Sequence, residues 1–232
     1  MITLSLLQFT TALQGKLINS NDISIDSVST DSRKFADNGL FVALKGERYD
    51  AHDFAQTAVN NGAKALLVER EIAVNVPQII VANTHTALGQ LGVLVRQHVK
   101  PIAIALTGSN GKTSVKEMLA TILLQRFKVL FTAGNFNNDI GVPLTLLRLT
   151  MGDQYGVFEL GANHKGEIDY TSGLVKPLVA LVNNIGSAHL EGFGSIEGIA
   201  QAKSEIFNHL QPDGTAVINA DDKFADFMAQ KE

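Results

Sequence analysis

Hydrophobic and polar residues follow two periodicities along this chain, and together they predict an α/β fold. In the N-terminal part, alternating or continuous apolar residues predict strands at 23–28, 40–44, 65–68 and 78–81. Helical spacing of apolar residues covers 5–14 and 51–61, and a glycine follows each of these segments. The pattern therefore predicts a small α/β domain over residues 1–83.

The remaining residues, 84–232, alternate more regularly between apolar strands and amphipathic helices. Strands are predicted at 102–107, 128–132, 155–160, 178–183 and 215–219. Helices are predicted at 84–98, 113–126, 141–149, 166–175 and 195–209. This alternation predicts a mainly parallel sheet covered on both faces, because parallel strands need helical crossovers. Ligands of such sheets bind beyond the carboxyl ends of the strands, so polar residues at those ends are candidates for a site.

The composition is typical of a globular protein. Hydrophobic residues make up 45% of the chain and charged residues 18%, which argues against intrinsic disorder. The net charge of −4 argues against a general nucleic-acid binder, and the absence of cysteine excludes disulfides and thiolate chemistry. No apolar run approaches the ~20 residues of a membrane span, and the N-terminus lacks a signal-peptide pattern. We therefore expect a cytoplasmic monomer that neither binds nucleic acid nor inserts into membranes.

A strand, a glycine-bounded turn and a helix follow one another around residue 110, which is the context of a phosphate-binding loop. The strand 102–107 leads into the sequence Gly108-Ser109-Asn110-Gly111-Lys112-Thr113-Ser114. Glycines allow backbone N–H groups to converge on an anion, and the helix N-terminus and Lys112 add positive charge. The two glycines are closer together than in the common P-loop. We expect these seven residues to bind a nucleoside triphosphate, with the Thr113 hydroxyl on Mg²⁺.

Two further strand ends carry polar residues that a parallel sheet would place near this loop. After strand 128–132 come three asparagines, Asn135, Asn137 and Asn138. One asparagine there would most simply cap a helix or build a turn. For three asparagines flanked by glycines, we weigh a ligand-binding role and this structural role equally. Glu159 stands at the end of an apolar strand, where a carboxylate is costly unless it is paired or bound to metal. Glu159 is thus a candidate Mg²⁺ ligand, with a buried ion pair as the alternative.

Two more candidates lie farther along the chain. His189 follows the strand 178–183. Alone, such a histidine is usually an ordinary loop residue, but at a third strand end of the same sheet we favour contact with metal or phosphate. Lys203, on the predicted helix 195–209, adjoins that helix's apolar face. Composition alone favours a lysine whose stem packs while its amine reaches solvent.

Together these motifs closely resemble the Mur ligase family. The resemblance rests on residues 107–113 with their short glycine spacing, on 134–143, on the strand end at Glu159, and on 189–194 and 202–207. In the N-terminal part, residues 30–34 and 40–54 resemble the nucleotide-sugar-binding domain of the family. Within the family, residues 159–168 resemble the member that joins D-alanyl-D-alanine to UDP-N-acetylmuramoyl-tripeptide.

The resemblance implies an ATP-dependent amide ligase of cytoplasmic peptidoglycan precursor synthesis, which acts through an acyl phosphate. It implies that Lys112 stabilises the ATP phosphates and that Thr113 and Glu159 hold one Mg²⁺. It also implies that Lys203 is carbamylated and binds a second Mg²⁺ together with His189. Lys112, Lys203 and His189 would then be the catalytic residues. The implied substrate-binding residues are Ser32, Arg33, Lys45, Asn137 and Asn138.

The chain is much shorter than Mur ligases, which carry a third, C-terminal domain that closes over ATP. We therefore expect a UDP-sugar-binding domain over residues 1–83 and an incomplete P-loop central domain over 84–232, truncated before the C-terminal domain. Such a fragment would bind ligands but lack a closed active site, and we expect it to be inactive alone. Two alternatives stay open. One is a nucleotide- or UDP-sugar-binding module without turnover, and the other is a different P-loop phosphotransferase or a sibling ligase of the folylpolyglutamate type.

Overall fold

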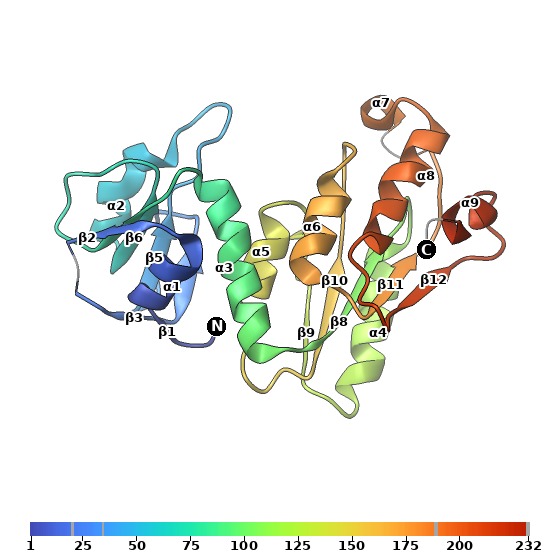
Figure 1. Cartoon of the computed structure of the whole chain (residues 1–232), viewed down its shortest axis with the longest axis horizontal. Helices are drawn as coiled ribbons and strands as arrows, with labels where there is room; N and C mark the ends of the chain where they lie inside the picture. Colours follow the sequence, from blue (N-terminus) through green and yellow to red (C-terminus); the bar gives the residue numbers. More distant parts are fainter. Residues whose placement is uncertain (20, 34, 188–189, 231–232) are drawn as a thin grey trace. The chain divides into compact units, whose positions relative to one another are not determined.

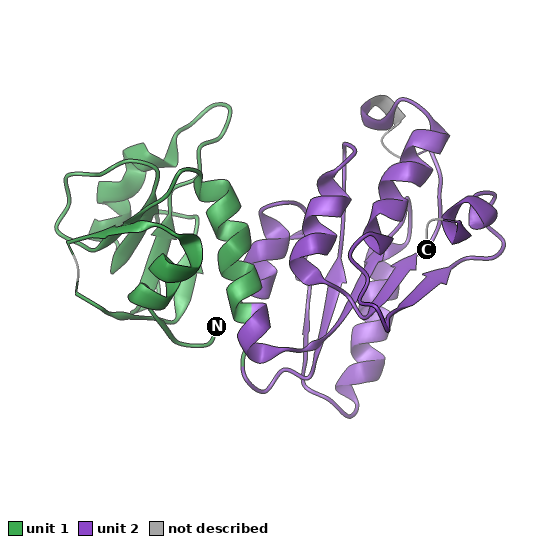
Figure 2. Cartoon of the chain, viewed as in Figure 1, with its two compact units in different colours: residues 1–95, 147–150 green, residues 96–146, 151–232 purple. Residues whose placement is uncertain are grey.

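The computed structural model describes residues 1–19, 21–33, 35–187 and 190–230. The chain folds into two compact units (Figure 2). Unit 1 comprises residues 1–95 and 147–150, and unit 2 comprises residues 96–146 and 151–232. The division falls inside helix α3 (Thr84–Val99). The domain boundary predicted at residue 83 directly precedes this helix and stays a prediction.

Unit 1 contains a five-stranded sheet in which most neighbours are parallel. The strand order is β2-β7-β6-β5-β4, with β2 antiparallel to β7 and the other pairs parallel. Its strands are β2 (Lys16–Ile18), β4 (Ser27–Ser29), β5 (Gly39–Val42), β6 (Ala65–Val68) and β7 (Gln78–Ile80). A separate antiparallel pair joins β1 (Leu4–Ser5) to β3 (Ser24–Ile25).

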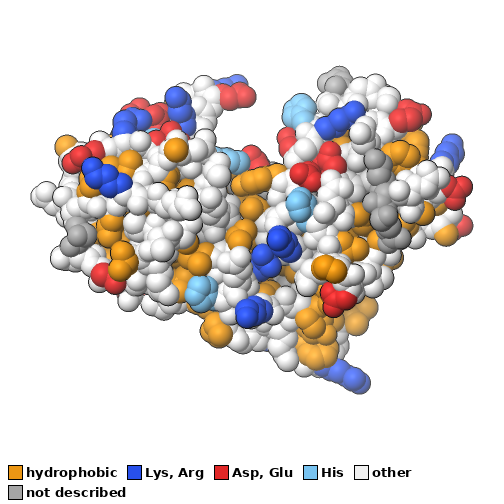
Figure 3. All heavy atoms as spheres, viewed as in Figure 1, with side chains coloured by type: hydrophobic (Ala, Val, Ile, Leu, Met, Phe, Trp, Pro, Cys, Tyr) orange, Lys and Arg blue, Asp and Glu red, His pale blue; other side chains and the backbone are white. Residues whose placement is uncertain are grey.

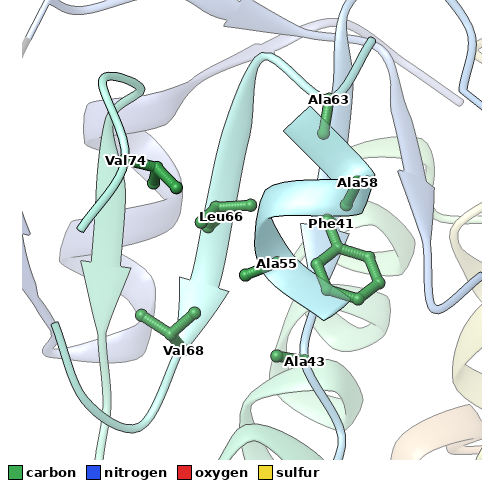
Figure 4. Packing of buried hydrophobic residues seen from close by; sticks show 8 residues of the cluster. All are labelled: Phe41, Ala43, Ala55, Ala58, Ala63, Leu66, Val68 and Val74. Atoms are coloured by element: carbon green, nitrogen blue, oxygen red, sulfur yellow. The ribbon is translucent and has the colours of Figure 1, made fainter. Parts of the chain in front are cut away.

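The core of unit 1 packs alternate strand residues against a short helical segment (Figure 4). Phe41 of β5 and Leu66 of β6 are fully buried in this cluster. The segment consists of the 3₁₀ turn η1 (Ala51–Phe54) followed by α2 (Ala55–Asn60), whose Ala58 is also fully buried. Alanines on the inner face of α2 allow the helix to approach the sheet closely, which leaves room for the large ring of Phe41.

Local capping determines where the first helix of unit 1 begins. Helix α1 (Leu6–Leu13) starts with a capping box, in which the Ser5 hydroxyl accepts from the Gln8 backbone and the Gln8 side chain accepts from the Ser5 backbone. It ends at Gln14, which adopts a left-handed conformation. More distant residues complete the cap, since the backbone N–H groups of Leu6 and Leu7 donate to the Ile23 carbonyl and to the Asp22 carboxylate.

Unit 2 is built on a five-stranded sheet in which every neighbouring pair is parallel. The strand order is β12-β11-β8-β10-β9. Its strands are β8 (Ile102–Thr107), β9 (Val129–Phe131), β10 (Tyr155–Glu159), β11 (Val179–Val182) and β12 (Thr215–Ile218). The register pairs Glu159 with Leu106, and Val182 with Thr107. The carboxyl ends of β10, β8 and β11 therefore lie next to one another.

Helices cover both faces of this sheet, with α6 and α8 on one face and α4 on the other (Figure 1). Leu119 and Leu123 of α4 pack on Leu106 and Val157, which belong to the central strands β8 and β10. The helices of unit 2 are α4 (Lys112–Leu124), α5 (Gly141–Leu146), α6 (Glu167–Val175), α7 (Leu190–Phe193), α8 (Ile196–Ser204), η2 (Glu205–Phe207) and α9 (Ala225–Ala229). The predicted α/β class, with a mainly parallel sheet in the P-loop unit, is confirmed.

Some predicted elements differ in detail. The single strand predicted at 23–28 is two short strands, β3 and β4, which belong to different sheets. Asp26 separates them, since its backbone N–H donates to Asn38 and its carboxylate accepts from the Asn38 side chain. The helix predicted at 195–209 ends as α8 at Ser204 and continues only as the 3₁₀ turn η2. Strand β2 was not predicted, because three residues are too short for alternation to be recognised.

The surface carries charges of both signs. On the face that Figure 3 shows, the described acidic and basic side chains are interspersed, and no broad single-sign patch covers it. In the described part of the chain, no helix has both the length and the apolar character needed to cross a membrane.

Candidate nucleotide and metal site

The phosphate-binding loop lies where β8 passes into α4, as the sequence predicts. Gly111 has φ +75° and forms the N-cap of α4, without any side-chain cap. A Cβ at Gly111 would lie 3.0 Å from the Asn183 side-chain nitrogen, so both the conformation and the space favour glycine. Because no side chain caps α4, its first N–H groups are available to an anion.

The loop that follows β11 holds the phosphate-binding loop in place. The backbone N–H groups of Ser109 and Asn110 donate to the Asn184 carbonyl and to its side-chain Oδ1, both at 2.9 Å. In return, the side-chain amides of Asn183 and Asn184 donate to the Asn110 carbonyl at 2.9 and 3.0 Å. The Ser109 hydroxyl donates to the Gly186 carbonyl and accepts from its N–H. This bracing orients the loop before any ligand is bound.

Asn183 and Asn184 received no role from the sequence. Their signal was the same as for Glu159, namely polar residues directly after a buried strand. What the sequence could not supply was the strand order, which places β11 beside the strand that carries the P-loop.

Glu159 is buried at the carboxyl end of β10, with 2% of its surface exposed. Its Oε2 accepts from the Thr113 hydroxyl at 3.0 Å, and its Oε1 accepts from the Asn137 side-chain amide at 2.9 Å. Its backbone N–H donates to the Thr132 hydroxyl at 3.0 Å. Among the described residues it forms no ion pair, so the alternative of a buried ion pair finds no partner there. A carboxylate beside a hydroxyl is a donor set that suits Mg²⁺.

The asparagine loop after β9 caps a helix and also contacts Glu159. Asn138 accepts from the Gly141 backbone and so caps the start of α5, which is the structural role considered for a single asparagine. The side-chain amide of Asn137 instead donates to the Glu159 carboxylate, and the Asn137 backbone carbonyl accepts from the Gly161 N–H. The loop therefore orients the Glu159 carboxylate as well as building a turn.

A pocket of about 190 Å³ gathers predicted site residues from three helix or loop segments of unit 2. Lys112, Asn137, Asn138 and Lys203 all line it, together with residues of the loop after β10. The Lys112 amine donates to the Gly108 carbonyl at 2.9 Å. Residues nearly a hundred positions apart in the chain thus share one pocket at the carboxyl edge of the sheet.

Lys203, on α8, is unusual because only 1% of its surface is exposed. Its amine therefore does not reach solvent as the expectation from composition requires. Within the described part of the chain, this amine has no hydrogen-bond or ion-pair partner. Burial, followed by the nearby charge of Lys112, lowers the pKa of Lys203 from 10.5 to about 8.

In unit 1, two of the predicted substrate-binding residues share a pocket of about 370 Å³. Ser32 and Arg33 line it, together with Asp31, Phe41 and others. Arg33 donates to both carboxylate oxygens of Asp31, and these hydrogen bonds lower the pKa of Asp31 to about 2. Lys45 is exposed and is not among the residues that line this pocket; its backbone forms an isolated antiparallel β-bridge with the backbone of Asp50.

Two predicted residues remain to be placed. Ser114 is exposed on the first turn of α4. His189 lies outside the described residues, so its predicted place beside the metal stays a prediction.

Comparison with protein families identifies the fold that carries this site. Residues 106–232 match the Mur ligase middle domain, and residues 24–98 match the catalytic domain of the Mur ligase family. The chain belongs to the Mur ligase family. The resemblance inferred from the P-loop and strand-end motifs is thus confirmed.

Individual Mur ligases show the same similarity across both units. The UDP-N-acetylmuramoyl-tripeptide–D-alanyl-D-alanine ligase of Escherichia coli is 57% identical over 221 residues, which are 95% of this chain and 49% of that protein. The Haemophilus influenzae ligase of the same name is 52% identical, over 100% of this chain and 52% of its own length. A crystal structure of MurF from Acinetobacter baumannii is 46% identical with a TM-score of 0.96, covering 100% of this chain and 52% of that one.

A MurF ligase from Thermotoga maritima, solved in complex with ADP, has a TM-score of 0.79 at 34% identity. It covers 89% of this chain, which covers 47% of that structure. The chain therefore spans about half the length of the Mur ligases that it matches.

The burial of Lys203 predicts a stability effect with a defined pH dependence. Since its folded pKa lies below its unfolded value, the unfolded chain binds more protons between pH 8 and 10.5. Lys203→Met should therefore raise the free energy of unfolding at neutral pH by about 1–3 kcal/mol, and this gain should vanish as the pH rises toward 10.5. Denaturant unfolding in CO₂-free buffer measures both values.

An exposed lysine, Lys64, provides the control for this experiment. Lys64→Met should change stability little and without this pH dependence. Destabilisation by Lys203→Met at neutral pH would contradict the view that the Lys203 amine is a buried, uncompensated cation.

Proposed function

We propose that this chain carries the ATP site and the UDP-substrate domain of a UDP-N-acetylmuramoyl-tripeptide–D-alanyl-D-alanine ligase. One observation carries the proposal: the P-loop residue Thr113 meets the buried Glu159 at 3.0 Å, beside a pocket lined by Lys112 and Lys203. The identity with relatives of that name supports these substrates over a folylpolyglutamate-type reaction. The proposal places the protein in the cytoplasm, as a monomer that acts on small molecules.

The residues of unit 2 fit ATP and Mg²⁺. The uncapped N-terminus of α4 and the Lys112 amine offer positive charge to the phosphates. Thr113 and Glu159 would hold one Mg²⁺ through oxygen atoms. When bound, Mg²⁺ offsets the negative charge of the transferred phosphoryl group. The ADP in the Thermotoga maritima relative supports the nucleotide assignment.

The proposed ligation has two steps. The terminal carboxylate of the UDP-linked tripeptide takes the γ-phosphoryl group of ATP, which gives an acyl phosphate and ADP. The amine of D-alanyl-D-alanine then attacks the acyl carbon; it loses a proton as the amide forms, and inorganic phosphate leaves. Lys112 and the backbone N–H groups at the uncapped start of α4 would stabilise charge on the phosphoryl oxygens. Because Asn183 and Asn184 already brace the preceding loop, little reorganisation is needed.

We also propose that Lys203 is carbamylated and binds a second Mg²⁺ together with His189. The neutral amine would attack CO₂ and lose one proton, so that a buried cation becomes an anion beside Lys112. The burial of this lysine and the pKa of about 8 of its amine support this, because a neutral amine is then accessible near neutral pH. The proposed role of His189 as a metal ligand rests on the family resemblance.

Mass spectrometry of the reaction products tests the proposed function. The substrates are ATP, UDP-N-acetylmuramoyl-tripeptide and D-alanyl-D-alanine, given to this chain and to a version extended to the length of its relatives. The extended protein should form the UDP-linked pentapeptide with equal amounts of ADP and phosphate. This chain should bind the substrates without turnover, because it spans only about half the length of the relatives that it matches.

The control for that measurement is Lys112→Ala in the extended protein. The variant should form no pentapeptide, since a charge-assisted phosphate contact is worth about 1.5–3 kcal/mol even before transition-state effects. Product formation with a different acceptor, but none with D-alanyl-D-alanine, would contradict the proposed substrates.

Arg33 provides a separate test of unit 1. Arg33→Ala should weaken binding of UDP-N-acetylmuramoyl-tripeptide about tenfold or more and leave ATP affinity unchanged, because Arg33 lines the unit 1 pocket. Calorimetric titrations with each ligand measure this, with the exposed Arg126→Ala of unit 2 as the control. Loss of neither affinity would identify Arg33 as an ordinary surface arginine, and equal loss of both would indicate misfolding.

Carbamylation of Lys203 has a direct readout in ¹³C NMR after addition of ¹³C-bicarbonate. The extended protein should show a carbamate signal that grows as the pH rises through about 8, because the neutral amine is the reactive form. Lys203→Ala should lack the signal and ligation, and acetate should restore part of the activity by supplying oxygen ligands. A Lys203→Ala variant with normal turnover would refute the assignment.

A further inference from the structure

We infer that Lys116 and Thr132 are positioning residues, which hold the Glu159 carboxylate in register with the P-loop. The inference rests on the proposed role of Glu159 as a Mg²⁺ ligand. Neither residue lines the pocket at Lys203, and neither belongs to the P-loop sequence itself. Their contacts nevertheless connect the three segments that meet at Glu159.

Lys116 lies on α4 one turn beyond Lys112 and Thr113, and it is fully buried. Its amine donates to the Thr132 carbonyl at 2.8 Å and pairs with Glu117 at 2.9 Å. The amine also lies 5.9 Å from the centre of the Phe131 ring. A buried ammonium is costly, and a lysine on a surface helix can usually extend to solvent instead. Here the amine turns inward and ties α4 to the end of β9.

Thr132 is equally buried and uses all of its polar groups. Its N–H donates to the Val157 carbonyl, its carbonyl accepts from Lys116, and its hydroxyl accepts from the Glu159 N–H at 3.0 Å. The residue after β9 is thus fastened to β10 on one side and to α4 on the other.

These contacts and the hydrogen bond between Thr113 and Glu159 form one connected network. Thr113 and Lys116 leave the same helix, and they reach Glu159 directly and through Thr132, respectively. The Thr113 hydroxyl holds the carboxylate itself, and the Thr132 hydroxyl holds the backbone N–H of Glu159, from which the side chain extends. Fixing both ends of the side chain preorganises a metal ligand. The cost of burying the Lys116 charge then has a functional reason, because α4 and β10 cannot shift independently.

A hydroxyl-specific pair of variants tests the inference. Thr132→Val removes the acceptor for the Glu159 N–H at nearly constant shape, and Thr132→Ser keeps it. Calorimetry of ATP binding to this chain, in Mg²⁺ and in EDTA, separates metal-dependent from metal-independent affinity. The ATP affinity of Thr132→Val should fall about threefold to tenfold in Mg²⁺ and change less than about twofold in EDTA. Thr132→Ser should behave as the unchanged chain does.

Matched controls account for the general cost of removing a buried hydroxyl. Thr10 of unit 1 is also buried and donates to the Leu6 carbonyl, so Thr10→Val should leave both ATP affinities unchanged. Thermal unfolding of each variant shows whether it folds. If Thr132→Val does not fold, Lys116→Met decides alone, since it removes the buried charge and keeps the length of the side chain.

Lys116→Met should show the same selective loss in Mg²⁺. In the double variant with Thr132→Val, the fold-loss of ATP affinity in Mg²⁺ should be smaller than the product of the two single fold-losses, because both substitutions act through Glu159. Full Mg²⁺-dependent affinity in folded Thr132→Val and Lys116→Met, or equal losses in EDTA, would overturn the inference. If the unchanged chain itself gains no affinity from Mg²⁺, the proposed metal role of Glu159 fails instead.

Discussion

The constraint on which unit 2 depends is a carboxylate that must be satisfied at the end of a buried strand. Glu159 is almost inaccessible to solvent, so each of its polar groups needs a partner from the protein. Thr113, Asn137 and Thr132 supply these partners from α4 and from the loop after β9. Only a parallel sheet brings those segments to one edge, and the same edge carries the phosphate-binding loop. The fold and the site therefore meet the same requirement.

Two lysine amines make this edge electrostatically unfavourable without ligands. Lys112 and Lys203 line one pocket, and the charge of the first adds to burial in lowering the pKa of the second. Sites that bind polyanions commonly concentrate positive charge at a cost in stability. ATP phosphates would offset the charge of Lys112, and a carbamate would reverse the charge of Lys203. The stability cost of Lys203 and its proposed chemistry thus have one origin, the removal of its amine from water.

The sequence predicted those features that local patterns determine. The P-loop is contiguous, so its glycines, Lys112 and the start of α4 were predictable from one segment. Glu159 was predictable because a carboxylate at the end of an apolar strand violates the hydrophobic pattern. The bracing of the P-loop by Asn184 was not, because it depends on β11 lying beside β8. The inward turn of Lys116 was not either, since a lysine on an amphipathic helix ordinarily extends outward. Residues whose role depends on strand order or on side-chain direction were therefore missed.

The most direct test of the account compares ATP binding to this chain and to Glu159→Gln, each titrated in Mg²⁺ and in EDTA. Glutamine keeps the shape of the side chain and an acceptor for Thr113, but it removes the negative charge that would hold the metal. The account predicts that Mg²⁺ strengthens ATP binding to the unchanged chain, and that Glu159→Gln loses this gain, by about tenfold or more, while its affinity in EDTA is preserved. Retention of the full Mg²⁺-dependent gain in Glu159→Gln would contradict the central claim that this buried carboxylate is the metal ligand beside the P-loop.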